Sequence, residues 1–263
     1  MVLRDMFWLW GHPEGAYNHK YGNDKLSRMT PMEGCLYLGV KNTFMIPAGE
    51  KEVNRRQYNK SFKTLKEVGW ECYNAGENPS LVEPFISEAK EFENIGRVVF
   101  DDFQRDGAYK NIPIENLWKI RKRLHENEVR PLGMWMVLYT REFGLDAEKD
   151  ADFKRYTEPF DGVIMWTWEE KDVPLIPEKF EIFKKLTPHN RRMFGCYLYN
   201  FGENRQATGK AVTWQLDWYR EKLLKKEAEG VVLHTNTMAD LDYEAYDAAC
   251  TWMKTHGDEV IPD

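Results

Sequence analysis

The sequence predicts a single (β/α)8 barrel over residues 1–263, in which eight parallel strands alternate with eight helices. Three observations lead to this fold class. Short apolar runs of strand length recur at fairly even spacing, separated by stretches whose apolar residues recur every three or four positions. The runs are apolar throughout, as is typical of parallel strands buried on both faces. No linker, low-complexity segment or short repeat divides the chain, and no Gly-rich phosphate loop follows the first run, which disfavours an open doubly wound sheet.

The predicted elements follow one another in strict alternation. The first strand stops at Gly11 and Pro13, which cannot continue it, while Gly69, Gly96 and Gly230 are predicted to end helices. The expected strands are residues 6–10, 42–46, 70–74, 97–100, 132–139, 163–168, 193–199 and 231–234. The expected helices are residues 31–38, 53–68, 85–95, 114–124, 151–156, 178–186, 212–229 and 243–254.

Composition limits the function classes. The chain is 42% hydrophobic and 30% charged, as in an ordinary soluble globular protein, and its net charge of −6 argues against nucleic acid as a partner. No apolar run reaches the roughly 18 residues that a membrane span needs. The N-terminus lacks the pattern of a signal peptide, and Cys35, Cys72, Cys196 and Cys250 show no metal-ligand spacing. A cytoplasmic location is therefore favoured, with a secreted or periplasmic one left open if a leader has been removed; the oligomeric state is open.

Polar and aromatic residues collect where the predicted strands end. Because the active site of a barrel of this kind is built from the C-terminal ends of its strands, these residues are candidate site residues. With 10 Trp and an aromatic share of 14%, the chain is also rich in the flat side chains on which sugar rings stack. The candidates are Trp10, His12, Glu14, Asn42, Glu71, Tyr73, Asp101, Asp102, Tyr139, Arg141, Trp166, Trp168, Glu169, Tyr199, Asn200, His234 and Asn236.

Carboxyl groups and aromatic faces with few cations suit a neutral polyhydroxylated ligand. Hydrolysis of a glycosidic bond needs two carboxyl groups, one protonated and one ionised. Asp101 and Asp102 follow the fourth strand and would point to opposite sides of it, so that one of them faces the barrel mouth unless the strand has already ended. We expect Glu169 to be the second catalytic carboxylate, with Glu71 as its substitute.

This arrangement resembles the TIM-barrel glycoside hydrolases of the α-galactosidase type. In that family an Asp at the end of strand four is the nucleophile and a carboxylate at the end of strand six is the acid/base. The resemblance covers the barrel plan and two strand ends, and it implies Asp101 or Asp102 as nucleophile and Glu169 as acid/base. Strand six offers a Glu where the family has an Asp.

Two other functions stay open at this stage. A carbohydrate-binding barrel without catalysis would use the same aromatic rim. A metal-dependent sugar isomerase or epimerase would need ligands from several strands, which Glu71, Asp101, Glu169 and His234 could supply, although no ligand spacing is recognisable. We therefore predict a glycoside hydrolase for an oligo- or polysaccharide, with a carbohydrate substrate as its partner and neither cofactor nor resident metal.

Overall fold

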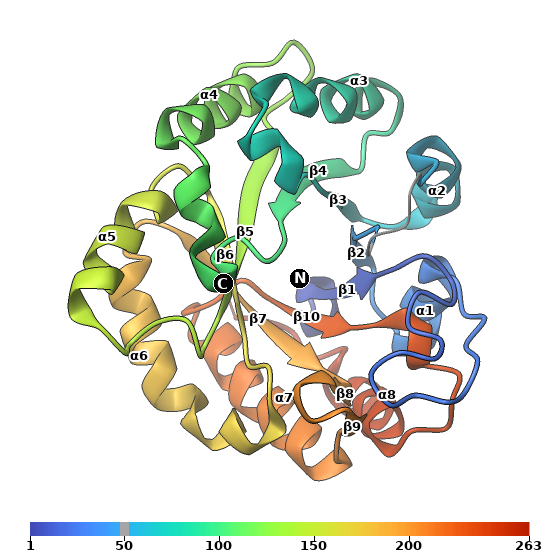
Figure 1. The fold of residues 1–263 in the computed structure, drawn as a ribbon. Helices are drawn as coiled ribbons and strands as arrows, with labels where there is room; N and C mark the ends of the chain where they lie inside the picture. The colour runs from blue at the N-terminus through green and yellow to red at the C-terminus, as the bar shows by residue number, and fades with distance from the viewer. Residues whose placement is uncertain (48–52, 263) are drawn as a thin grey trace.

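The computed structural model describes residues 1–47 and 53–262. Within them, eight parallel strands close into a barrel in the order β1-β10-β7-β6-β5-β4-β3-β2, with the helices arranged around its outside (Figure 1). The predicted (β/α)8 barrel is thus confirmed. The barrel strands are β1 Phe7–Gly11, β2 Asn42–Met45, β3 Glu67–Glu71, β4 Ile95–Phe100, β5 Gly133–Tyr139, β6 Gly162–Trp166, β7 Arg191–Tyr197 and β10 Gly230–His234. A separate antiparallel ribbon pairs β8 Tyr199–Asn200 with β9 Arg205–Gln206.

An α-helix follows each barrel strand, and local capping determines where several of them begin. The hydroxyl of Thr30 accepts a hydrogen bond from the backbone N–H of Glu33, whose carboxylate in turn accepts from Thr30 N, a capping box before Pro31. The helices are α1 Pro31–Leu38, α2 Arg55–Ser61, α3 Glu83–Glu91, α4 Ile114–His125, α5 Ala147–Thr157, α6 Ile176–Leu186, α7 Gly209–Leu224 and α8 Glu244–His256. None of the helices in the described part of the chain is long and apolar enough to span a membrane.

Several predicted boundaries are wrong, and three of them fall at glycines. Gly69, Gly96 and Gly230 were expected to end helices, but all three lie inside strands β3, β4 and β10. At Gly69 a side chain would collide with the ring of Phe44, 2.4 Å from an added Cβ. Gly69 therefore provides space for a neighbouring ring inside the barrel and does not mark a chain reversal.

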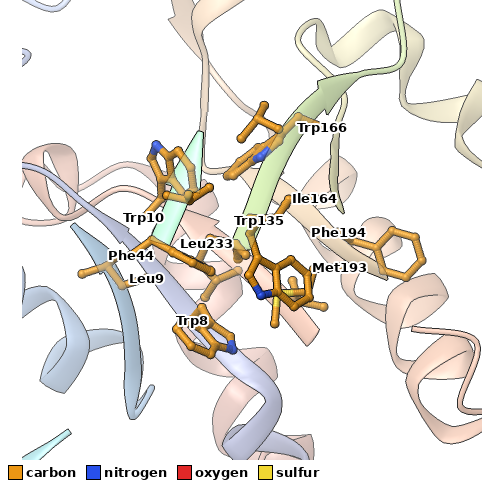
Figure 2. Close-up of a cluster of buried hydrophobic side chains, with 14 of the residues drawn as sticks. Trp8, Leu9, Trp10, Phe44, Trp135, Ile164, Trp166, Met193, Phe194 and Leu233 are labelled. Atoms are coloured by element: carbon orange, nitrogen blue, oxygen red, sulfur yellow. The ribbon is translucent and has the colours of Figure 1, made fainter. Parts of the chain in front are cut away.

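Large aromatic side chains fill the barrel interior. Figure 2 shows Trp10 and Trp166 at one end of a buried cluster, with Trp8 and Trp135 at the other. Trp166 fits because the neighbouring strand carries Gly195, where an added Cβ would lie 1.9 Å from the indole ring. The rings of Trp10 and Trp166 pack edge to face at 5.4 Å and form the floor beneath the C-terminal ends of the strands.

A buried arginine closes the opposite end of the barrel. The guanidinium of Arg97 lies 4.5 Å from the ring centre of Trp8 and 4.6 Å from that of Trp135. It donates hydrogen bonds to the carboxylates of Glu67 and Glu229, at 2.6 and 2.9 Å. Charge pairing and ring contacts together offset the cost of burying this cation.

Candidate active site

One pocket of about 230 Å³ opens at the C-terminal ends of the strands. Its lining side chains come from the ends of five strands, β1, β5, β6, β7 and β10, and from loops that follow the strands. The lining consists of Trp10, Tyr17, Tyr21, Asp101, Asp102, Arg105, Tyr139, Arg141, Trp166, Trp168, Tyr197, Phe201 and His234. Eight of the residues that the sequence predicted as site residues are brought together here: Trp10, Asp101, Asp102, Tyr139, Arg141, Trp166, Trp168 and His234.

Both aspartates border this pocket because the fourth strand has already ended. Strand β4 stops at Phe100, and Asp102 adopts a left-handed backbone conformation with φ of 49°. The Asp101 carboxylate accepts a hydrogen bond from the backbone N–H of Asp102 at 2.9 Å. The expectation that the two side chains point to opposite sides of a continuing strand is therefore replaced by a turn that presents both.

Asp101 lies where a carboxyl group favours its protonated form. Burial raises its pKa well above the ordinary value of 3.8, and the negative charges of Asp102 and Glu71 raise it further. Opposing contributions from the Asp102 N–H and from Arg105 are smaller. A carboxyl group in such surroundings can hold a proton near neutral pH and donate it.

Asp102 accepts hydrogen bonds from two side chains. The Tyr139 hydroxyl donates to Oδ1 at 3.0 Å, and the Arg105 guanidinium donates to Oδ2 at 3.0 Å. The Tyr197 hydroxyl donates in turn to that of Tyr139 at 3.4 Å, which extends the chain of hydrogen bonds into the barrel. Both carboxylate oxygens of Asp102 therefore have a donor, one from β5 and one from the turn that follows β4.

Aromatic rings form most of the remaining wall. Trp166 contacts Tyr197 with ring centres 4.7 Å apart, and Trp168 contacts the same tyrosine at 5.4 Å. Arg141 lies over Trp168, with its guanidinium 5.1 Å from the ring centre. Phe201 completes the group, 6.1 Å from Trp168. The pocket therefore offers flat apolar faces beside a pair of carboxyl groups.

The long loop after β1, residues 12–30, closes one side of the pocket. It carries Tyr17 and Tyr21, and several hydrogen bonds attach it to the rest of the barrel rim. The Tyr199 hydroxyl donates to the carbonyl of Tyr21 at 2.7 Å, and the Tyr243 hydroxyl donates to Asn23 Oδ1 at 2.8 Å. This wall is thus held by side chains from the far end of the sequence.

Two neutral histidines lie behind this loop. Burial lowers the pKa of His12 to about 4 and that of His234 well below its usual value. Because His12 Nδ1 lies 3.0 Å from the carbonyl of Ile46, that nitrogen carries the proton, and Nε2 accepts from the Tyr17 hydroxyl at 3.1 Å. Asn236 bonds to both the N–H and the carbonyl of His12, at 2.8 and 3.0 Å. Of the predicted residues His12, His234 and Asn236, His234 alone lines the pocket, and the other two hold its wall.

The two predicted glutamates lie outside the pocket lining. Glu169 follows β6 by three residues, and its carboxylate forms an ion pair with Lys171. Strand β6 ends at Trp166, so the predicted strand to residue 168 was too long. Glu71, the last residue of β3, accepts a hydrogen bond from the N–H of Tyr73, and burial raises its pKa. Its charge acts on Asp101 from beside the pocket.

Tyr73 lines a second, more open hollow of about 480 Å³. Asp101, Asp102 and Arg105 border this hollow as well as the first one. The carboxyl pair therefore stands between the two hollows. Gly107, Ala108 and Asn111 complete the lining of the second.

The other predicted residues have different positions. Glu14 is exposed on the loop after β1, and Tyr199 supports that loop from behind. The Asn200 side chain accepts from the N–H of Glu203 and so caps a short turn. Asn42 is the first residue of β2 and bonds to the carbonyl of Phe7 at the opposite end of the barrel. Its assignment to the C-terminal rim was wrong, because Asn42 is at the N-terminal end of its strand.

Four pocket residues could not be assigned from the sequence: Tyr17, Tyr21, Phe201 and Tyr197. The first three lie on loops, whose path the periodicity of the sequence does not give. Tyr197 was missed because the predicted seventh strand ended two residues too late. Arg105 lies within one helical turn of Asp102, a spacing that allows an i,i+3 ion pair, and this signal could have identified it.

No metal centre is formed by the described residues. Among residues 1–47 and 53–262, no three His, Cys, Asp or Glu side chains are grouped so that they could hold a metal ion. Glu169, with its carboxylate on Lys171, and His234, buried against His12, do not join Glu71 and Asp101 in a ligand set.

Comparison with solved structures supports the fold. A chitinase domain from Pyrococcus furiosus, determined as catalytic-site mutants with chito-oligosaccharides, superimposes with a TM-score of 0.62 and 13% identity, over 98% of this chain and 97% of that one. A chitinase from Chromobacterium violaceum superimposes with a TM-score of 0.52 and 8% identity, over 94% of this chain and 98% of that one. Tryptophan synthase from Mycobacterium tuberculosis superimposes with a TM-score of 0.50 and 12% identity, over 98% of this chain and 94% of that one. No protein-family model and no curated protein matches the sequence.

The chain therefore has a TIM-barrel fold of the kind found in glycoside hydrolases such as chitinases. The tryptophan synthase match shows that this fold is shared with proteins of other activities. The narrower resemblance to α-galactosidase-type barrels stays a prediction.

Proposed function

We propose that this protein hydrolyses a glycosidic bond in an oligo- or polysaccharide. The observation that carries the proposal is the pair Asp101 and Asp102, which share one pocket but have different surroundings. The charges of Asp102 and Glu71 act on Asp101, whereas Asp102 accepts hydrogen bonds from Tyr139 and Arg105. Glycoside hydrolysis requires such a pair of carboxyl groups in different protonation states.

In the proposed reaction, Asp101 is the acid. Its proton passes to the glycosidic oxygen as the bond to the anomeric carbon breaks, and Asp102 stabilises the positive charge that develops on the sugar ring. Water supplies the hydroxyl group of the product and returns a proton to the carboxyl pair. Glu169 was the expected acid/base, but its carboxylate pairs with Lys171; the proposal therefore gives that role to Asp101.

The pocket walls suit a sugar ring. Trp10, Trp166 and Trp168 present apolar faces, while the Tyr17, Tyr139 and Tyr197 hydroxyls lie near the carboxyl pair, whose charges act on all three phenols. Sugars combine apolar ring faces with polar edges, and tyrosine and tryptophan match both.

A screen with aryl glycosides and glycans, chito-oligosaccharides among them, tests the proposal. The wild type is compared with Asp101→Asn, Asp102→Asn and Glu169→Gln. We expect the aspartate variants to lose turnover and Glu169→Gln to keep most of it. Binding without turnover by the wild type would instead favour a carbohydrate-binding barrel.

A further inference from the structure

We infer that the enzyme removes single sugar units from the non-reducing end of its substrate. This inference rests on the proposed function and specifies its substrate: a chain with an unblocked terminal sugar. It follows from the shapes of the two hollows on either side of the carboxyl pair.

The aromatic pocket has room for little more than one sugar ring. Its volume of about 230 Å³ is below the range of roughly 300–1,000 Å³ that is typical of pockets for drug-sized ligands. Trp10 and Trp166 close it from below, since both are buried and pack against one another. A chain cannot continue through this floor.

The loop after β1 closes the pocket on the side of Tyr17 and Tyr21. The ring of Tyr21 packs against Phe201 at 5.1 Å, and its carbonyl is held by the Tyr199 hydroxyl. Tyr17 contacts the same Phe201 ring, also at 5.1 Å. The three rings bridge the loops after β1 and β7, and a longer chain would have to displace them.

The second hollow gives the rest of the substrate a way out. It measures about 480 Å³, and it shares Asp101 and Asp102 with the aromatic pocket. A chain with its terminal ring in the aromatic pocket would pass between the two carboxyl groups and leave over Tyr73 and Asn111. The scissile bond would then lie beside the pair.

The chemistry decides which part of the substrate takes which hollow. Positive charge develops on the ring whose anomeric carbon is attacked. Aromatic faces attract positive charge, and an enclosed site strengthens electrostatic stabilisation. The ring of Trp166 is almost fully buried beneath the pocket. The charged ring therefore belongs in the aromatic pocket, and the leaving chain belongs in the open hollow.

Products from a 4-nitrophenyl trisaccharide, built from the sugar that the screen selects, test the inference. We expect the first products to be one free monosaccharide and a 4-nitrophenyl disaccharide. A trisaccharide blocked at its non-reducing terminal hydroxyl should resist cleavage. Internal cleavage, or equal rates on blocked and unblocked chains, would overturn the inference and leave the proposed function standing. Absence of turnover on every glycoside would overturn both.

Two variants test the walls of the hollows. Tyr21→Ala removes the ring that closes the pocket and should allow cleavage of the blocked trisaccharide. Tyr37→Ala on α1 is the matched control and should not allow it, since the side chains are similarly exposed, at 39% for Tyr21 and 42% for Tyr37.

Tyr73→Ala should lower kcat/KM for the trisaccharide by about three- to tenfold, which corresponds to the loss of one aromatic contact. It should leave a glycosyl fluoride of the same sugar nearly unaffected, because a fluoride leaving group is too small to contact Tyr73. An equal loss on both substrates would contradict the assignment of the open hollow to the leaving chain.

Discussion

The hydroxyl of Tyr139 donates a 3.0 Å hydrogen bond to Oδ1 of Asp102, which joins the end of β5 to the turn that follows β4. Tyr139 is buried, and Tyr197 donates to its oxygen in turn. Asp101, one residue away, lacks such a phenol partner among the hydrogen bonds of the described residues and has a raised pKa. The two neighbouring carboxyl groups therefore have different surroundings, as the proposed assignment of Asp101 as the acid requires.

Replacement of Tyr139 by Phe tests this hydrogen bond. A hydrogen bond to a charged group contributes about 1.5–3 kcal/mol, so we expect Tyr139→Phe to lower kcat/KM by about 10- to 100-fold. Tyr109→Phe is the matched control, since Tyr109 also donates to an aspartate, Asp152 at 3.5 Å, but lies outside both hollows. Equal losses in the two variants would show that the effect is structural and does not act through Asp102.

The raised pKa of Asp101 predicts a pH dependence of stability. The folded state holds this proton at a pH where the unfolded chain, with a carboxyl pKa near 3.8, has released it. The contribution of Asp101 to the free energy of unfolding is therefore complete below pH 3.8 and is lost as the pH rises through the folded-state pKa. Asp101→Asn should remove this loss, so that the variant is more stable than the wild type at pH 7 in urea unfolding.

Asp5 provides a control of opposite sign. Burial opposes its ionisation, but the N–H of Val2 and the ammonium of Lys41 together lower its pKa below 3.8. Asp5→Asn should therefore lose stability at pH 7 and approach the wild type in acid. If Asp101→Asn behaves as Asp5→Asn does, the carboxyl group of Asp101 is not held in its protonated form.

Arg97 should contribute to stability and not to catalysis. Arg97→Met leaves Glu67 and Glu229 without their shared cation at the end of the barrel opposite the pocket. Removing one partner of a buried pair costs roughly 3–5 kcal/mol. Since the two carboxylates keep 30% and 27% of their side-chain exposure, we expect a loss of about 2–3 kcal/mol in denaturant unfolding. A change in KM beyond twofold would contradict this separation of roles.

Gly195→Ala tests the space that Trp166 occupies. An added methyl group would lie 1.9 Å from the indole, and overpacking of a core costs about 1–3 kcal/mol. Because Trp166 forms part of the pocket floor, kcat/KM should fall as well. Gly209→Ala, where the nearest atom is the Ala248 Cβ at 3.3 Å, should change both measurements little. A stable and fully active Gly195→Ala variant would contradict the role of this glycine.

The barrel could be predicted from the sequence because most of its strands contain a short apolar run, such as residues 98–100 in β4 and 134–139 in β5. The predicted ends of helices and strands were wrong where a residue that can end a helix instead has a packing role in a strand. Glycine commonly ends helices, but Gly69 lies in a strand and leaves space for Phe44 of the neighbouring strand. Such cross-strand packing depends on register, which a linear pattern does not contain.

The site was predictable where it follows directly from a strand end. Asp101, Asp102, Tyr139 and Trp166 lie within two residues of the ends of their strands and meet in one pocket. Tyr17 and Phe201 come from loops, and the path of a loop depends on long-range contacts such as that between Tyr199 and Tyr21. Glu169 was misplaced because β6 ends earlier than its apolar run suggests.

The most direct test of the central claim is the dependence of Asp101→Asn activity on the leaving group. A sugar leaving group needs a proton from the acid, whereas 2,4-dinitrophenolate leaves without one. If Asp101 is the acid, Asp101→Asn should lose about 10²- to 10⁴-fold in kcat/KM on the oligosaccharide and almost nothing on the 2,4-dinitrophenyl glycoside, while Asp102→Asn loses activity on both. Equal losses of the Asp101→Asn variant on the two substrates would contradict the account.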